Sequence, residues 1–267
     1  MSNFTLMMVK YIAIFFILFI SFISKIYCQG EIDNQKKIFY RNERSFRVGL
    51  NSNGYGIDYR YGKRMSYTEK KLYEVHLDII KHPKEIKISN PYGAKFVFGK
   101  LNSLASIKLG YGYQKELFEK VDKGGISIKY FYSYGPSIGI LKAIYYLAYY
   151  PDDDEYREEK FNSTTHSENT IKSQVPFYKY FWEMKIVPGI YGQAGFHFEY
   201  SKVDAVLHAI EVGSGAELFA RKMALMDVEG GDQQFFLYLF VRYRFGKIID
   251  PLAKKRKQEY KKYLREY

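Results

Sequence analysis

The sequence has very little cysteine and tryptophan, with one residue of each among 267. Because the single cysteine is Cys28, the chain cannot build a framework of internal disulfides. Long apolar runs are also lacking after residue 23, and 26% of the residues are charged. These two features exclude an ordinary bundle of membrane helices, since each such helix needs about 20 consecutive apolar residues.

The one run apolar enough to enter a membrane as a helix covers residues 11–23, between Lys10 and Lys25. Its length suits the core of a signal peptide better than a spanning helix. We expect cleavage after Cys28, which makes residues 1–28 a signal peptide. Two alternatives stay open. The segment could remain as an uncleaved anchor, or Cys28 could be lipidated, although Tyr27 is bulkier than the residue that normally precedes a lipidated cysteine.

Aromatic residues are abundant, with 28 Tyr and 21 Phe. Together with β-branched residues, this surplus favours strands. From Ser45 onward, apolar and polar residues alternate with a period of two in one segment after another. The predicted strands lie within 45–50, 54–62, 70–80, 103–113, 125–132, 137–150, 190–201, 208–218 and 233–246.

The last of these segments, 233–246, has two contrasting faces. One face carries aliphatic and aromatic side chains: Phe235, Leu237, Leu239, Val241, Tyr243 and Phe245. The opposite face carries Arg242 and Arg244. In a membrane barrel the first face meets lipid and the second lines the interior. In a soluble barrel the two faces exchange places, so alternation alone does not choose between them.

Glycine favours the membrane orientation. Strand glycines gather on the polar faces: Gly49, Gly56, Gly62, Gly110, Gly112, Gly195, Gly213 and Gly215, with Gly139 and Gly192 as exceptions. A solvent-facing strand surface has no need of glycine, which weakens strands. The crowded interior of a small barrel does need it, for bends and for room beside long charged side chains. The apolar faces also place tyrosines toward strand ends, as an aromatic girdle requires.

The expected number of strands depends on how the connections between them are interpreted. Residues 51–54 form either a tight hairpin or a bulge, and short turns are expected at 134–137 and 201–204. Longer polar segments cover 63–69, 114–124, 151–186 and 220–232, and we expect them on the side opposite the short periplasmic turns. Residues 82–101 are too long for a turn and could hold another hairpin. The count is about eight strands if 45–62 is one bent strand. It is about ten if 51–54 is a true hairpin and 82–101 adds a strand.

The final segment resembles the C-terminal strand of Gram-negative outer-membrane barrels, which alternates apolar residues and ends on an aromatic. Val241, Tyr243 and Phe245 carry the resemblance, although Phe245 is not the last residue. With the strand plan, it implies an all-β fold, an antiparallel transmembrane barrel of eight or ten strands in the outer membrane. The expected parts are the signal peptide (1–28), a periplasmic lead-in (29–43), the barrel (44–246) and a basic periplasmic tail (247–267).

The inward faces carry charges of both signs, which can be tolerated if they pair. His76 stands between Glu74 and Asp78, and His197 stands two residues before Glu199. Such pairs could serve as the acid–base group of a barrel enzyme that hydrolyses lipid or peptide. The candidate nucleophiles, by residue type alone, are Ser106, Ser127 and Ser201. The other interpretation is an internal salt-bridge network, because residues two apart on a strand always share a face.

An acidic run at 151–160 holds the candidate metal ligands Asp152, Asp153, Asp154 and Glu155. Oxygen-rich clusters suit calcium, but the run lacks the glycine and spacing of an EF-hand. A flexible charged loop is the alternative. His82, His166 and His208 show no zinc spacing, no phosphate-binding loop appears, and we predict no cofactor.

The net charge of the chain is +12. The tail 247–267 contains eight Lys or Arg and three Asp or Glu, which leaves +5. We expect outer-membrane lipid as the main partner, with the tail reaching a periplasmic partner or anionic headgroups, or simply remaining solvated. A secretion signal argues against nucleic acid. The predicted role is structural, adhesive or accessory to envelope assembly or secretion, without enzymatic activity or an open channel. A barrel enzyme and a narrow solute pore are the alternatives. The sequence leaves the ligand and the oligomeric state undetermined.

Overall fold

The computed structural model describes residues 42–89, 95–120, 124–150, 155–163, 165–167, 170–202, 205–228 and 231–249. All of these residues belong to one compact unit. The predicted signal peptide and nearly all of the predicted lead-in and tail lie outside the described residues.

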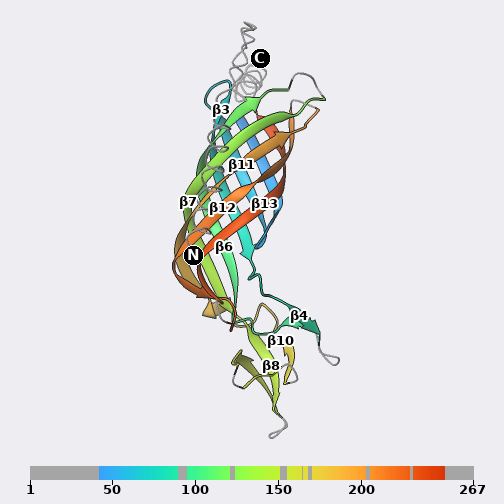
Figure 1. Ribbon diagram of the computed structural model, residues 1–267, viewed down its shortest axis with the longest axis vertical. Coiled ribbons are helices and arrows are strands. Elements are labelled where there is room, and N and C mark those ends of the chain that lie inside the picture. Colours follow the sequence, from blue (N-terminus) through green and yellow to red (C-terminus); the bar gives the residue numbers. More distant parts are fainter. Residues whose placement is uncertain are drawn as a thin grey trace, which may run out of the picture. The chain divides into compact units, whose positions relative to one another are not determined.

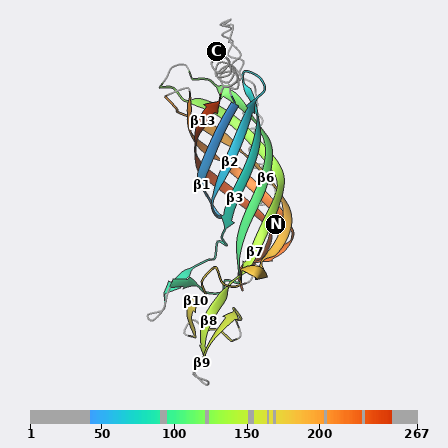
Figure 2. The same cartoon turned by 180° about the vertical axis from the view of Figure 1, so that it is seen from behind.

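Eight antiparallel strands close into a barrel, in the order β1-β13-β12-β11-β7-β6-β3-β2 (Figures 1 and 2). The first strand pairs with the last, from Asn42 opposite Ile249 to Asn51 opposite Phe240, so the sheet has no free edge. The barrel strands are β1 (Asn42–Asn51), β2 (Gly54–Arg64), β3 (Glu69–Ile80), β6 (Asn102–Phe118), β7 (Ser127–Ala143), β11 (Lys185–Glu199), β12 (Val206–Ala224) and β13 (Asp232–Ile249). The prediction of an eight-stranded antiparallel barrel is confirmed.

The eight barrel strands do not correspond one to one to the predicted strands. Residues 51–54 form a true hairpin, because Asn51 pairs with Gly54 across a two-residue turn. The predicted turn at 134–137 is wrong, since this segment lies inside the single long strand β7. Pro136, which has no N–H to donate, is tolerated because the pairing with β6 is interrupted between Ser137 opposite Lys108 and Tyr134 opposite Tyr111.

Residues 82–101 do contain a hairpin, made of β4 (Lys87–Ser89) and β5 (Lys95–Val97). It forms a separate two-stranded sheet and adds no strand to the barrel. The alternative of ten strands is therefore wrong, because only one of its two conditions is met: 51–54 is a true hairpin, but 82–101 does not add a strand to the barrel. The predicted strand 137–150 likewise leaves the barrel after Ala143, and β8 (Tyr145–Tyr150) belongs to another sheet.

The connections gather at two ends of the barrel. Both described chain ends, Asn42 and Ile249, lie at the terminal end, together with the connections 65–68, 119–126 and 200–205. The hairpin turn 52–53 and the connections 81–101, 144–184 and 225–231 lie at the other end, called the extension end. The predicted grouping is thus partly wrong, because 63–69 and 114–124 share the terminal end with 201–204. Strand direction reverses at every connection, and this alternation decides the end regardless of loop length.

The faces of the strands match the predicted membrane orientation. Leu237 and Leu239 are 68% and 66% exposed, whereas Arg242 and Arg244 are 1% and 0% exposed. Outward aromatic rings contact one another across β13, β1, β2, β3, β6 and β7 near the terminal end, in pairs such as Phe46 with Phe245, and Tyr73 with Tyr111. An apolar exterior with an aromatic belt at its margin is the surface that a transmembrane barrel presents to lipid.

Two inward glycines show why the interior needs them. A Cβ on Gly49 would lie 2.5 Å from Cγ of Arg242. A Cβ on Gly56 would lie 2.7 Å from both the carboxyl carbon of Asp78 and the carbonyl oxygen of Leu77. Such distances are well inside van der Waals contact. The charged side chains therefore fill space that a larger residue on the neighbouring strand would occupy, as predicted for a small barrel.

The connections 81–101 and 144–184 fold together, and their described parts are called the extension below. A three-stranded sheet joins β8 to β9 (Glu155–Lys160) and β10 (Ile171–Gln174). Its core draws on both connections: Phe96, Ile144, Tyr146, Phe161 and Ile171 are buried, with Ile88, Phe98 and Leu101 partly buried against them. The Tyr146 hydroxyl lies 2.7 Å and 2.9 Å from the carbonyl oxygens of Val97 and Lys100. Burial raises the pKa of this hydroxyl.

The short 3-10 helix η1 (Phe181–Glu183) leads into β11. Within the described ranges, no helix is long and apolar enough to cross a membrane.

Candidate functional site

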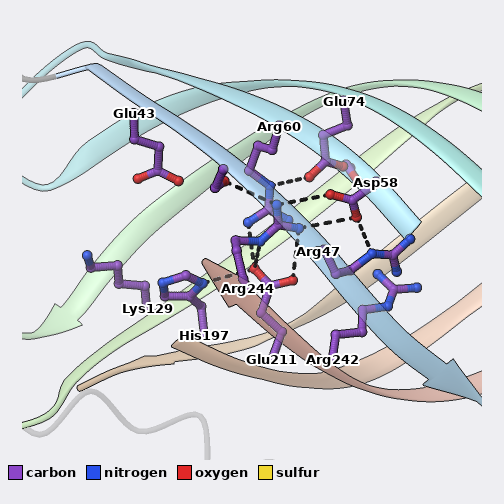
Figure 3. A network of polar contacts seen from close by, with 12 residues as sticks. Glu43, Arg47, Asp58, Arg60, Glu74, Lys129, His197, Glu211, Arg242 and Arg244 are labelled. Atoms are coloured by element: carbon purple, nitrogen blue, oxygen red, sulfur yellow. Dashed lines mark hydrogen bonds and ion pairs between the residues drawn. The ribbon is translucent and has the colours of Figure 1, made fainter. Parts of the chain in front are cut away.

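The chemistry-bearing side chains of the barrel lie in its interior, and Arg244 on β13 is at their centre (Figure 3). Its Nε and Nη2 donate to Oε1 and Oε2 of Glu211 on β12, at 2.8 Å and 3.1 Å. Its Nη1 and Nη2 donate to Oδ1 and Oδ2 of Asp58 on β2, at 3.0 Å and 3.3 Å. One guanidinium thus binds each of two carboxylates through two hydrogen bonds. It connects β12 to β2, the first and last strands of the run β12-β13-β1-β2.

Arg60 on β2 extends this network. Its Nη1 donates to Oε1 of Glu211 at 2.6 Å, and its Nε is in close contact with Glu74 on β3. The guanidinium carbon also lies 4.9 Å from the ring centre of Phe131 on β7. Glu211 therefore accepts from two arginines, and each arginine is neutralised by more than one carboxylate.

A second group lies on the side of the network nearer the extension end. Arg47 on β1 contacts Asp58 closely and is 3.4 Å from Oδ1 of Asp78. Lys108 bridges Asp78 and Glu217 at 3.2 Å and 2.9 Å. These contacts continue the pairing of opposite charges along the interior.

The inward charges balance. Among the described residues, the buried inward carboxylates are Glu43, Asp58, Glu74, Asp78, Glu199, Glu211 and Glu217, and the buried inward cations are Arg47, Arg60, Lys70, Lys108, Lys129, Arg242 and Arg244. Removing ions from water costs several kcal/mol each, and only close pairing with further hydrogen bonds offsets this cost. Arg242 differs from the rest, because it donates to Oε1 of Gln193 at 2.8 Å and stacks 3.5 Å from the ring centre of Phe240.

The two candidate histidines lie within this network. Nε2 of His76 is 3.1 Å from Oε2 of Glu74, as the sequence suggests, but its Nδ1 faces Asp58 at 3.2 Å. Nδ1 of His197 is 2.9 Å from Oε1 of Glu211. Glu199, the sequence partner of His197, instead binds Lys129 at 2.5 Å.

The structure does not bring the candidate serines to these histidines. The Ser106 hydroxyl donates to Glu217 at 2.5 Å, and that of Ser127 donates to Glu116 at 2.6 Å. The Ser201 hydroxyl accepts the backbone N–H of His208 at 2.6 Å. Each candidate nucleophile is hydrogen-bonded to a group other than His76 or His197. The arrangement therefore supports histidines held in an ion-pair network rather than histidines that activate a serine hydroxyl.

Apolar side chains fill the interior at the extension end. Leu225 and Met226, from the connection between β12 and β13, are buried with Val97 of β5 among inward residues of the barrel. The other members of this cluster are Ile80, Leu104, Leu141, Val187, Phe219, Met223 and Phe236. The N–H of Leu101 bonds to the carbonyl oxygen of Leu225 at 2.9 Å, which ties the connection to the start of β6. These residues cover the charged network on this side.

The terminal end holds a polar cavity of about 250 Å³. Lys70 binds Glu43 at 2.6 Å beside it, while Lys120 and Lys129 both bind Glu199. The remaining lining residues are Arg64, Glu116, Glu119, Ser127, Ser201 and Ile248. Mixed charges that already pair with one another line this cavity, so its walls do not favour a ligand of either sign.

Most of the candidate metal ligands lie outside the described residues. Asp152, Asp153 and Asp154 are outside the described residues, and Glu155 opens strand β9, where it binds Arg157 at 3.2 Å. In the described part of the chain, no group of three or more His, Cys, Asp or Glu residues is arranged to hold a metal ion. The acidic run therefore continues into a strand of the extension.

Sequence reasoning missed three members of the interior network. Arg47 alternates with the outward residues Phe46 and Val48, so the period-two rule would have placed it inward. Glu43 precedes the predicted barrel and Lys70 opens a predicted strand, and both lie inward near the terminal end. At its other end the barrel extends three residues past the predicted limit of Gly246, to Ile249. Strand ends carry few alternating residues, which is why their faces are hard to assign.

No protein-family model matches this sequence, and the curated proteins include no match. Among solved structures, Ail, the attachment invasion locus protein of Yersinia pestis, in complex with the heparin analogue sucrose octasulfate, is similar with a TM-score of 0.37 and 6% identity. The similarity covers 79% of this chain and 100% of that one. Neisserial surface protein A has a TM-score of 0.34 and 7% identity, over 79% of this chain and 96% of its own.

Likenesses at this level say nothing about function, and the architecture is established by the strand order and the two faces of the strands. In a bilayer, only helices and closed barrels satisfy every backbone polar group. An even-numbered antiparallel barrel with an apolar exterior and an aromatic belt is the outer-membrane type. The chain is an outer-membrane β-barrel.

Proposed function

We propose that this barrel is a non-enzymatic membrane scaffold that displays the extension as an adhesive, ligand-binding module. The observation that carries the proposal is that the two longest described connections fold on each other around the shared core of Phe96 and Tyr146. Ordering so much chain costs conformational entropy, and a segment that only links two strands does not require this order. Function on barrel proteins is commonly carried by loops that a rigid scaffold positions.

The interior supports the same assignment. Its cations and carboxylates pair with one another, and the apolar cluster around Phe219 covers them at the extension end. An eight-stranded barrel is just wide enough for side chains to fill. We therefore infer a structural role for the interior, including His76 and His197, and expect the reconstituted chain to show no steady conductance in a planar bilayer.

We infer the orientation from the same features. Outer-membrane barrels have short periplasmic turns and longer extracellular loops. The terminal end, with its shorter connections and both described chain ends, would face the periplasm, and the extension would face outward. The signal peptide over 1–28 would direct export. The basic tail would begin at the periplasmic mouth, where anionic headgroups or a periplasmic partner would meet it.

The test is attachment of bacteria that carry the full chain on their surface to cultured epithelial cells, compared with an empty vector. A Phe96→Ala/Tyr146→Ala variant removes the core shared by the two connections, and Ile190→Ala on the outer wall of β11 is the matched control. We expect attachment above the vector level for the chain and the control, and its loss in the double variant, with heat-modifiable gel migration retained in all. Attachment that never exceeds the vector, or that the double variant leaves unchanged, would overturn the proposal.

A further inference from the structure

The segment 175–184, between β10 and β11, has two chemically different sides. Its polar residues bind the hairpin of β8 and β9. Nζ of Lys179 and the hydroxyl of Tyr180 donate to Glu158, at 2.6 Å and 2.9 Å. The carboxylate of Glu183 binds Lys160 at 2.8 Å and accepts from the Tyr145 hydroxyl at 2.6 Å.

The Tyr180 ring adds an apolar element to this attachment. It stacks on Tyr145, with ring centres 4.0 Å apart and planes 22° apart. Its backbone is left-handed, with φ 55°, which is unusual for a tyrosine and is held here by the contacts of its side chain. The segment is therefore fixed to the extension through one side.

The other side of the segment is aromatic and uncovered. Phe177, Tyr178 and Phe181 are 62%, 76% and 53% exposed, and Trp182, the only tryptophan of the chain, is 96% exposed. Four large aromatic side chains within six residues make an apolar patch that is costly in water and marks a contact surface. Tryptophan and tyrosine are also the residues that gather at membrane–water interfaces.

The patch continues the lipid-facing wall of the barrel. Phe177 lies against that wall, because Nζ of Lys142 on the outward face of β7 is 4.4 Å from its ring centre. Trp182 precedes the outward residue Ile186 by four positions. Even a fully extended chain would place the two at most about 14 Å apart.

The length of the wall places the patch at a membrane boundary. Ile186 and Phe198 lie on the outward face of β11, 12 positions apart. At about 3.3 Å per residue and a tilt of about 40°, they are separated by roughly 30 Å along the membrane normal, which equals the hydrocarbon thickness. With Phe198 near the aromatic belt of the terminal end, Ile186 reaches the opposite boundary. The segment before it lies at headgroup level, where the exposed Lys185 would meet lipid phosphates.

We propose that Tyr178, Phe181 and Trp182 insert into the headgroup layer of the leaflet at the extension end and hold the extension in a fixed orientation on the membrane. The occupant of the patch is lipid, which the continuity with the lipid-facing wall favours over a protein partner. This inference depends on the membrane-spanning barrel and is independent of what the extension binds.

The single tryptophan makes the test direct. The full chain is refolded into phosphatidylcholine–phosphatidylglycerol vesicles, and its Trp fluorescence is measured. One lipid series carries bromine on acyl carbons near the headgroup, another carries it near the chain end, and iodide is the aqueous quencher. We expect a blue-shifted emission relative to tryptophanamide, stronger quenching by the shallow bromine than by the deep one, and weak quenching by iodide.

The matched control is Trp182→Phe/Tyr156→Trp, which moves the tryptophan to exposed Tyr156 on β9. We expect its emission to resemble that of tryptophanamide and iodide to quench it freely. If Trp182 in vesicles behaves like this control, the proposal is overturned. Protection that appears only when a protein ligand is added would assign the patch to that ligand instead. Attachment of cells is a separate readout, so either proposal can fail without the other.

Discussion

The guanidinium of Arg244 on β13 lies between two carboxylates of different strands, with Nε 2.8 Å from Oε1 of Glu211 and Nη1 3.0 Å from Oδ1 of Asp58. All three side chains are fully buried. The barrel thus closes around charges that neutralise one another, while its apolar side chains face outward. The stability of the fold depends on these pairs as well as on the lipid.

Arg244→Ala should strongly destabilise the barrel. Removing one partner of a buried ion pair leaves the carboxylates uncompensated, which typically costs about 3–5 kcal/mol. Unfolding by guanidinium in lipid vesicles, followed by heat-modifiable migration, measures the change. Arg44→Ala is the control, since Arg44 is exposed on the same pair of strands, and its effect should stay within about 0.5 kcal/mol. Equal stabilities of the two variants would contradict the structural role of the network.

Ala216→Arg should destabilise the barrel in vesicles by about 2–4 kcal/mol, the cost of an arginine on the lipid face near the midplane. Ala216 lies in the outward row of β12, opposite Gly192, which is midway between Ile186 and Phe198 on β11. Tyr200→Arg, in the outward row near the terminal end, should cost only about 0–1 kcal/mol, because the penalty falls toward the interface. The free energy of unfolding in vesicles is the measurement. No dependence on depth would show that this face does not meet a hydrocarbon core.

Gly49→Ala should cost about 1–3 kcal/mol, the usual effect of overfilling a packed interior. Its Cβ would lie 2.5 Å from Cγ and 3.1 Å from Cβ of Arg242, atoms that cannot move far without the strand. Gly192→Ala is the matched control, because its Cβ would meet nothing within 4 Å. The same unfolding experiment compares them, and an equal effect would mean that Gly49 is not needed for close approach.

The attachment of segment 175–184 should weaken in acid. The hydrogen bond from Lys179 lowers the pKa of Glu158, and that from Lys160 lowers the pKa of Glu183, from an ordinary value of 4.5. Because both folded pKa values are depressed, this stabilisation is fully present above 4.5 and is lost as the pH falls through the lowered values. The protection factors of the amides of 179–183, which are hydrogen-exchange rates corrected for the intrinsic effect of pH, should fall over that range. Glu158→Gln/Glu183→Gln should remove most of the dependence, and protection that does not change with pH would contradict the attachment.

The sequence predicted which face of a strand points inward better than it predicted which side chains pair between strands. Alternation and glycine correctly placed Arg242 and Arg244 inside and Leu237 and Leu239 outside, because a strand's period of two is a local property. The partner of His197 could not be read this way. Glu211 stands directly opposite His197 on β12, and this pairing depends on register between strands rather than on spacing within one.

Two further differences between prediction and structure also arise from contacts between segments that are distant in the sequence. The dipeptide Gly135-Pro136 has turn chemistry, yet pairing with Tyr191 and Ile190 of β11 keeps it extended, and tertiary context overrides the local preference. The extension left no periodic signal, because its core joins Phe96 to Tyr146 across two connections that are far apart in the sequence. The end to which each connection belongs follows from strand alternation once β7 is recognised as a single strand.

The orientation of the apolar face toward lipid is best tested by a spin-label scan of the outward row of β13 in vesicles. Labels at Phe235, Leu237, Leu239, Val241 and Tyr243 would be compared for collision with oxygen, which concentrates in hydrocarbon, and with a water-soluble nickel chelate. If the apolar face meets lipid, oxygen will dominate in the middle of the row and nickel only toward its ends. Nickel access that dominates at every position would show that the apolar face does not meet lipid, and would overturn the membrane-spanning arrangement.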